Sequence, residues 1–369
     1  MRFTGTHMGE RHMKSAMMVG TALVASLCAF AASAASALAA ERQAVTIAIG
    51  TNVLDTSQAN NTSVPIASKC WEKEGLDVTI QPTNSSAATQ AVLSGQAQFV
   101  LMGPGRAVIA RSQGAPLKAV YMNMRKNFQF PVVQASSPIK SIEDFKGKTM
   151  GVVSYGAQLV AIIKGMIAEA GMDPEKDITI VETGVGAQAV AALKSGRVDV
   201  WGTWDSQIAT AENMGLELRR FTSPYAEKLK FGSSYFVRDD YIKSHPEVIT
   251  KVLRCVAKGT VMALENPTGT VKTHWKVYPA TKPTGVAEDE AFRQGLHVLK
   301  VRAEFLELDK GEKWGEFPPQ AITDMVEFMK ATGELKGDVN PADLYTNQFI
   351  DAVNAFDHEA TVQEAKALN

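Results

Sequence analysis

The sequence is poor in cysteine and has no excess of charge of either sign. Only three cysteines occur among its 369 residues, which excludes a cysteine-rich zinc or iron–sulfur site. Lysine and arginine number 38 against 39 aspartates and glutamates, so the chain lacks the positive charge that nucleic-acid binding requires. Hydrophobic residues make up 45% and charged residues 21%, a globular balance that excludes a disordered or collagen-like chain. At about 100–200 residues per domain, we expect two domains.

The first forty residues differ from the rest and predict a targeting segment. Positive residues precede an uncharged stretch, residues 15–40, that ends in small side chains. This pattern is typical of a secretory signal peptide, residues 1–40, with an A-x-A cleavage site at Ala37-Leu38-Ala39. A retained membrane anchor is the alternative, because the stretch is long enough to span a bilayer. No later apolar run reaches that length, so we expect a periplasmic protein that meets a membrane only through a partner.

Two cysteines, Cys70 and Cys255, follow the predicted cleavage site. They could form one disulfide in an oxidising compartment, or both could be buried thiols. The sequence does not decide between these states, and we favour free thiols.

No motif of catalytic or cofactor chemistry is present. The sequence has neither a G-x-S-x-G nucleophile elbow nor a P-loop lysine. The histidines after residue 40 are too widely separated for a metal-ligand spacing: His245, His274, His297 and His358. We therefore expect no enzyme, no metal ion and no cofactor.

One pattern of strands, helices and glycines occurs twice. The first copy covers Ala44–Met102 and the second covers residues 148–203. Each runs strand, helix, strand, helix, strand, and the second helix of each closes at a Ser-Gly pair, Ser94-Gly95 and Ser195-Gly196. Alternating strands and helices predict parallel βαβ units. Two copies therefore predict two similar α/β domains.

Small, polar or glycine residues follow the strands of both copies. Ligands bind at the carboxyl ends of strands in open α/β sheets, so we expect these loops to form a binding site. Several loops open helices, whose free N–H groups suit an anionic oxygen, although the same side chains could cap the helices instead. Trp204 could stack on a ligand. Arg106 could pair with a carboxylate or sulfonate, but we favour a solvated helix residue.

Several segments, in this order and spacing, resemble the solute-binding proteins of ABC importers for nitrate, sulfonates, taurine and related solutes, including precursors of the thiamine pyrimidine. The resemblance covers nearly all of residues 45–369. The segments are SIEDFKGKTMGV (141–152), MIAEAGMDPEKDITIV (166–181), ALKSGRVDVWGTWD (192–205), SSYFVRDDYIKSHPEVITKVL (233–253), ALENP (263–267) and DLYTNQFIDAVNAFD (343–357).

The resemblance implies a type II periplasmic binding-protein fold, with two α/β lobes that close on a solute at a two-strand hinge. Lobe one would comprise residues 41–135 plus 230–369, and lobe two residues 136–229. The hinge crossings would lie near Phe130–Gln134 and Lys230–Ser234. The cleft residues that carry over are Asn52, Ser85, Gly103, Asn123, Ser154, Tyr155, Gly184 and Trp204. The glycine-rich run Met102-Gly103-Pro104-Gly105 departs from the family pattern.

The resemblance further implies a monomer that captures a small organic anion and delivers it to an ABC permease with its ATPase. An aliphatic sulfonate such as taurine is the first choice, and an aromatic acid or a pyrimidine precursor is the second. An enzyme on the same fold, similar to thiamine-pyrimidine synthases, is an alternative. Those enzymes rely on a cysteine-rich motif and a reactive histidine, which the cleft segments here lack. A solute receptor for a sensor is a further alternative.

Overall fold

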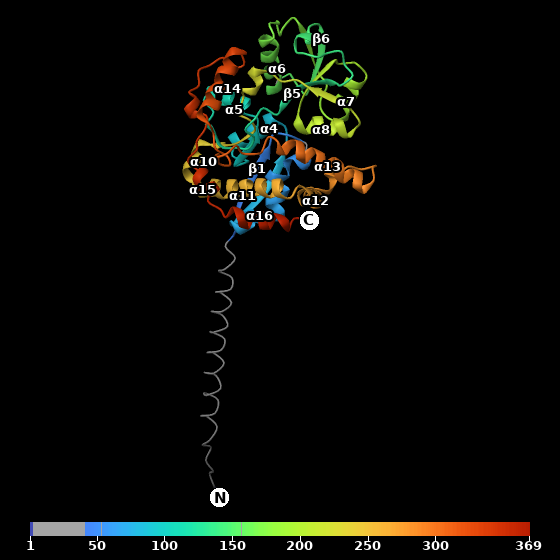
Figure 1. Ribbon diagram of the computed structural model, residues 1–369. Helices are drawn as coiled ribbons and strands as arrows, with labels where there is room; N and C mark the ends of the chain where they lie inside the picture. Colours follow the sequence, from blue (N-terminus) through green and yellow to red (C-terminus); the bar gives the residue numbers. More distant parts are fainter. Residues whose placement is uncertain (3–40, 53, 156) are drawn as a thin grey trace. The chain divides into compact units, whose positions relative to one another are not determined.

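Two five-stranded sheets organise Ala44–Asn369, which forms one compact unit (Figure 1). The computed structural model describes residues 1–2, 41–52, 54–155 and 157–369. The predicted signal peptide falls almost wholly outside the described residues, so its cleavage site stays a prediction. Within those ranges, no helix combines the length and apolar character that a membrane crossing needs.

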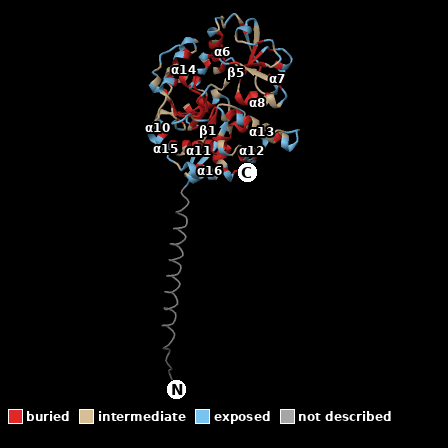
Figure 2. Cartoon of the chain, in the orientation of Figure 1, coloured by how far each residue is buried: buried red, intermediate tan, exposed pale blue. Residues whose placement is uncertain are grey.

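The first sheet has the strand order β2-β1-β3-β10-β4. β1 runs parallel to β3, with Ile47 opposite Phe99, whereas β10 runs antiparallel to both β3 and β4. β3 is buried along its whole length, as expected of a central strand with helices on both faces. Figure 2 shows buried residues gathered in the interior around β1, and exposed residues on the outside. Its strands are β1 Gln43–Ile49, β2 Leu76–Pro82, β3 Phe99–Met102, β4 Leu117–Met122 and β10 Ser234–Arg238.

The second sheet repeats this arrangement in the order β7-β6-β8-β5-β9. β6 runs parallel to β7 and β8, and β5 runs antiparallel to β8 and β9. The predicted duplication and the α/β class are therefore confirmed. Its strands are β5 Gln129–Gln134, β6 Lys148–Val152, β7 Ile178–Glu182, β8 Val200–Trp204 and β9 Leu218–Arg220. We call each sheet with the helices inserted between its strands the first half and the second half.

The chain passes between the two sheets twice, from β4 to β5 and from β9 to β10. The second passage contains the expected crossing near Lys230–Ser234. The first lies earlier than the expected Phe130–Gln134, between Met122 and Gln129. The expected segment forms β5 instead, because Val132 pairs with Trp201 on one side and with Arg220 on the other. β5 thus belongs to the second sheet, although the expected lobe one ran to residue 135.

Helices follow the strands of both halves in the predicted order. The glycines expected to end helices adopt left-handed backbone, with φ of 80° at Gly95 and 72° at Gly196, which a residue with a Cβ rarely tolerates. The helices between strands are η1 Thr56–Asn61, α2 Ser63–Ala67, α3 Cys70–Lys73, α4 Ser85–Leu93, α5 Pro104–Ser112, η2 Glu143–Phe145, α6 Gln158–Glu169, α7 Ala187–Lys194, α8 Asp205–Asn213 and α9 Pro224–Glu227.

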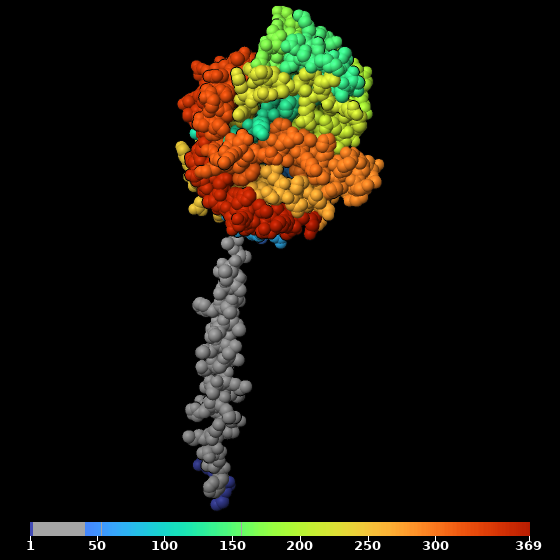
Figure 3. Space-filling model, in the orientation of Figure 1, coloured from blue at the N-terminus to red at the C-terminus, as the bar shows by residue number. Residues whose placement is uncertain are grey.

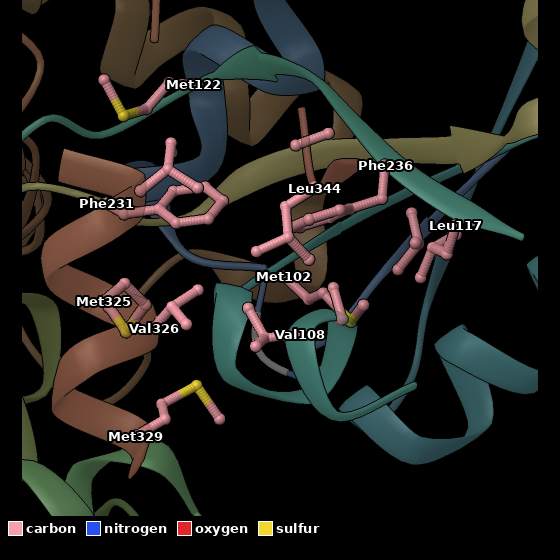
Figure 4. Packing of buried hydrophobic residues seen from close by; sticks show 14 of the residues in the cluster. Met102, Val108, Leu117, Met122, Phe231, Phe236, Met325, Val326, Met329 and Leu344 are labelled. Atoms are coloured by element: carbon pink, nitrogen blue, oxygen red, sulfur yellow. The ribbon is translucent and has the colours of Figure 1, made fainter. Parts of the chain in front are cut away.

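The C-terminal helices pack on both halves (Figure 3). Val298 and Val301 of α13 pack against Ala209 of α8. Met325 and Met329 of α14 share a core cluster with residues of β3, α5 and α6 (Figure 4). These helices are α10 Asp239–Ser244, α11 Pro246–Glu265, α12 Pro267–Val277, η3 Pro279–Thr281, α13 Glu288–Ala303, α14 Pro319–Ala331, η4 Pro341–Asp343, α15 Ile350–Asn354 and α16 His358–Lys366.

Cys70 and Cys255 form a disulfide, so the preference for free thiols is wrong. The bridge joins α3 to α11, whose cysteine Cα atoms lie 5.6 Å apart, within the range that a disulfide spans. The two cysteines are 185 positions apart in the sequence, and only the packing of α3 on α11 brings them together.

One buried histidine, His274, should make the free energy of unfolding depend on pH. His274 is fully buried, with Nδ1 2.9 Å from Ser63 Oγ and Nε2 3.2 Å from the Leu54 carbonyl oxygen. Burial lowers the pKa of His274 below 6.5. Below that pH the unfolded chain binds a proton that the native protein does not, so the free energy of unfolding should fall as pH decreases.

The variant His274→Asn should lose this contribution. We expect the melting temperature of the wild type to fall more between pH 7 and pH 5 than that of the variant. Thermal melts at both pH values measure the difference, and equal slopes would show that His274 does not control it.

Candidate functional site

A cavity of about 500 Å³ lies where the strand ends of the two halves meet. The loops after β1, β2 and β3 line it from the first half, and those after β6, β7 and β8 line it from the second. The passages between the sheets contribute Met124, Phe128 and Ser233. The cavity therefore occupies the position expected from the duplicated sequence pattern, at the carboxyl ends of the strands.

Five of the sequence-predicted site residues line this cavity, and they come from both halves. They are Asn52, Ser85, Gly103, Ser154 and Trp204. Their roles in binding a solute stay predictions, but the fold brings residues that lie far apart in sequence to one cavity.

Three predicted site residues lie elsewhere. Asn123 is buried, and its Oδ1 accepts a hydrogen bond from Asn60 Nδ2 at 3.4 Å. Tyr155 is 59% exposed, and its backbone N–H donates to Glu182 Oε1 at 2.8 Å. Gly184 lies in the loop before α7 with a φ of 69°. None of the three is among the residues that line the cavity.

Several helices begin at the cavity, and they differ in how their N-termini are capped. Asn84 caps α4, because its side-chain oxygen accepts a hydrogen bond from the Ala87 N–H at 2.9 Å. Of the two roles that the sequence left open, this side chain therefore has the capping role. Gly103 and Ala157, the residues before α5 and α6, provide no side-chain cap. Free N–H groups at the start of a helix such as α6 suit an anionic oxygen. At α5, the first residue is Pro104, which has no N–H, and the Gly105 N–H is bonded to a side chain.

The glycine-rich run after β3 contacts the second half. The Gly105 N–H donates to Gln158 Oε1, the first residue of α6, at 3.2 Å. A Cβ added to Gly103 would lie 2.8 Å from the same oxygen, and one at Gly105 would lie 3.3 Å from Gln158 Cγ. The two glycines thus leave room for Gln158 to approach, which explains the departure from the family pattern noted in the sequence.

We expect Gly103→Ala to weaken solute binding about three- to tenfold. The new methyl group would displace the flexible end of Gln158 and break its contact with Gly105, so the two halves would meet less well, with little loss of stability. Titration calorimetry against a binding solute measures the affinity. Gly337→Ala is the matched control, because its φ is not positive, an added Cβ would lie 3.8 Å from the nearest atoms, and Gly337 does not line the cavity. Unchanged affinity in the Gly103 variant would contradict this role for the run.

Aromatic and apolar side chains form much of the remaining wall. Trp204 stands at the junction of β8 and α8, and its Nε1 donates to Ser206 Oγ at 3.2 Å. This bond holds the indole ring in place, half-buried at the cavity. Phe128 adds a second ring, and Leu101, Met102, Met124 and Leu159 add apolar surface.

Arg302 reaches the cavity from α13, although no sequence pattern predicted it as a site residue. Its Nε and Nη2 donate to the two carboxylate oxygens of Asp205 at 2.5 and 2.7 Å. Both side chains are buried, at 3% and 0% exposure. Asp205 is the first residue of α8, where a carboxylate is favoured by the helix dipole. No spacing in the sequence links Arg302 to the strand loops, because only the packing of α13 on α8 brings it there.

Three glutamines in the lining also escaped the sequence analysis: Gln58, Gln129 and Gln158. Gln158 follows the recognised loop that begins at Ser154, and Gln129 directly precedes the expected crossing near Phe130–Gln134, so their positions offered a weak signal.

Two arginines line the cavity, and Asp205 neutralises one of them, Arg302. Among the described residues that line it, Arg106 and Arg302 are charged and no carboxylate is present. Arg106, exposed in the first turn of α5, lines the cavity although the sequence favoured a solvated position. In the part of the chain that the structure describes, no cluster of His, Cys, Asp or Glu could hold a metal ion.

The chain belongs to the NMT1/THI5-like family. The model of that family matches residues 70–270, more than half of the chain. The riboflavin-binding protein RibY of Chloroflexus aurantiacus is 25% identical over 66% of this chain and 67% of its own length. The 4-amino-5-hydroxymethyl-2-methylpyrimidine phosphate synthase THI13 of Saccharomyces cerevisiae is 25% identical over 58% of this chain and 64% of its own length. These matches span about two thirds of each relative.

Solved structures share the fold. The periplasmic aliphatic sulphonate binding protein SsuA of Escherichia coli superposes with a TM-score of 0.63 and 16% identity, over 82% of this chain and 91% of its own. The fold is therefore that of the type II periplasmic binding proteins, as the resemblance in the sequence implied.

Proposed function

We propose that this protein is an extracytoplasmic solute-binding protein that captures a small organic anion in the cavity and delivers it to an ABC importer. The observation that carries the proposal is the cavity itself, which loops from both halves line at the carboxyl ends of their strands. Closure of two halves on a solute would require no chemistry from the protein. A monomer in the periplasm, with an ABC permease and its ATPase as partner, fits this role.

The lining supports an anionic solute with an apolar or ring-bearing body. Arg106 and the start of α6 favour an anionic group. Trp204 and Phe128 favour a body with a flat apolar face. A cavity of about 500 Å³ lies within the range that organic ligands of moderate size occupy, so it accommodates more than taurine. The fold shared with a sulphonate-binding protein supports a sulfonate head group, and RibY supports a ring.

A thermal-shift screen of the purified protein tests the proposal. The panel contains sulfonates, carboxylates, nitrate, pyrimidines and flavins, because a ligand that binds the native state raises the melting temperature by mass action. We expect a saturable rise with one class of organic anion. The bound solute should be recovered chemically unchanged, as mass spectrometry would show. Unfolding and refolding the protein first removes any co-purified solute. If the refolded protein then shows no rise in melting temperature with any of the classes, the proposal is contradicted.

An enzyme on this fold is the second candidate, because the yeast relative is a pyrimidine phosphate synthase. The same mass-spectrometric measurement separates the two functions. If the solute recovered from the protein is chemically altered, the result favours the enzyme.

A further inference from the structure

Arg302 lies in the cavity wall with part of its hydrogen-bonding capacity unused. Its Nε and Nη2 are taken by Asp205, and its guanidinium lies 5.6 Å from the centre of the Phe128 ring. Among the described residues, no group accepts a hydrogen bond from Nη1. Arg302 lines the cavity, so its Nη1 can donate to an acceptor that arrives there.

Gln129 presents a second unsatisfied group on the same wall. Its Oε1 is buried, and no described residue donates a hydrogen bond to it. Gln129 pairs with Trp204 across β5 and β8, and the Asp205 N–H donates to the Phe128 carbonyl oxygen at 3.0 Å. These contacts join Phe128, Gln129, Trp204, Asp205 and Arg302 into one stretch, which we call the Arg302 wall.

The charge of the Arg302 wall selects the kind of acceptor. Asp205 neutralises Arg302, so a carboxylate or sulfonate placed on Nη1 would lie beside the Asp205 carboxylate in a site with little water to screen the repulsion. An uncharged oxygen meets no such repulsion. Gln129 Oε1 in turn suits an N–H donor. A ring carbonyl beside a ring N–H offers both groups, and a flat ring fits between aromatic side chains.

We propose that Arg302 contacts the solute and selects an uncharged ring carbonyl, with Asp205 as the residue that positions the guanidinium. The inference rests on the proposed function, because it names one contact of the solute in the same cavity. The anionic group of the solute then lies near Arg106, which lines the same cavity.

Titration calorimetry with four probes tests this selection. Orotate and riboflavin 5′-phosphate carry an anionic group and a ring carbonyl beside a ring N–H, whereas benzoate and ethanesulfonate carry only the anionic group. Arg302→Lys keeps the charge but loses the planar fork that serves Asp205 and the solute together. The double variant Arg302→Met with Asp205→Leu removes both charges, so no unpaired carboxylate is left buried and the fold should persist. Thermal melts confirm folding of each variant.

We expect the wild type to bind orotate or riboflavin 5′-phosphate, and both variants to bind that probe at least tenfold more weakly. Affinity for benzoate or ethanesulfonate, where measurable, should change less than threefold. An equal loss for all probes, or no loss, would assign Arg302 a structural role and overturn the inference. A wild type that binds only benzoate or ethanesulfonate would overturn it while the proposed function stands. A wild type that binds none of the four also overturns it, and the wider thermal-shift panel then decides the proposed function separately.

Discussion

Trp204→Ala should weaken solute binding at least tenfold without unfolding the protein. The indole ring lines the cavity and is held by its bond to Ser206, so it offers a preformed flat surface. A covered tryptophan buries about 150–250 Å². Loss of about 60 Å² of this contact, at about 25 cal/mol per Å², costs about 1.5 kcal/mol, which is tenfold in affinity. Titration calorimetry with the solute identified by thermal shift measures the change.

Trp314→Ala is the matched control for this experiment. Trp314 packs against the core of the first half and does not line the cavity. Its removal should lower the melting temperature and leave the affinity within about twofold of the wild type. Trp204→Ala should instead lower the affinity and leave the melting temperature nearly unchanged. Unchanged affinity in the Trp204 variant would remove this side chain from the site.

Loss of the disulfide should destabilise the protein by about 2–5 kcal/mol. The bridge between Cys70 and Cys255 closes a long loop, with 185 positions between its ends, and it joins α3 to α11 in the core of the first half. Its removal increases the freedom of the unfolded chain, in the chain-entropy account of disulfides. We expect the variant Cys70→Ala with Cys255→Ala to unfold at a markedly lower urea concentration than the oxidised wild type.

The effect of a reductant provides the control. Dithiothreitol should lower the melting temperature of the wild type towards that of the double alanine variant and leave the variant itself unchanged. Reaction of Cys70 and Cys255 with a thiol reagent in the wild type unfolded without any reductant would show that the bridge is absent; unfolding is needed because both are buried.

The local patterns of the sequence determined the fold class and the position of the cavity. Alternating strands and helices, with glycines at helix ends such as Gly95 and Gly196, reflect short-range preferences that the sequence carries directly. The duplication predicted two similar sheets, and the loops at their strand ends supplied cavity residues such as Ser85 and Trp204. Asn123 and Tyr155 show the limit of this reasoning, because a position near a strand end does not determine where a side chain points.

Contacts between distant segments were decided only by the tertiary structure. β5 joins the second sheet through its pairing with β8 and β9, so the first passage between the sheets lies earlier than its sequence suggested. The disulfide depends on the packing of α3 on α11, and Arg302 reaches the cavity because α13 packs on α8. Residues that meet in this way have no fixed spacing along the chain. They meet because helices and strands bury their apolar faces against one another, and one sequence pattern is compatible with many such packings. The sequence by itself therefore determined the two α/β units and the loops of the cavity. Only the tertiary structure decided that Arg302 joins the cavity lining and that Cys70 pairs with Cys255.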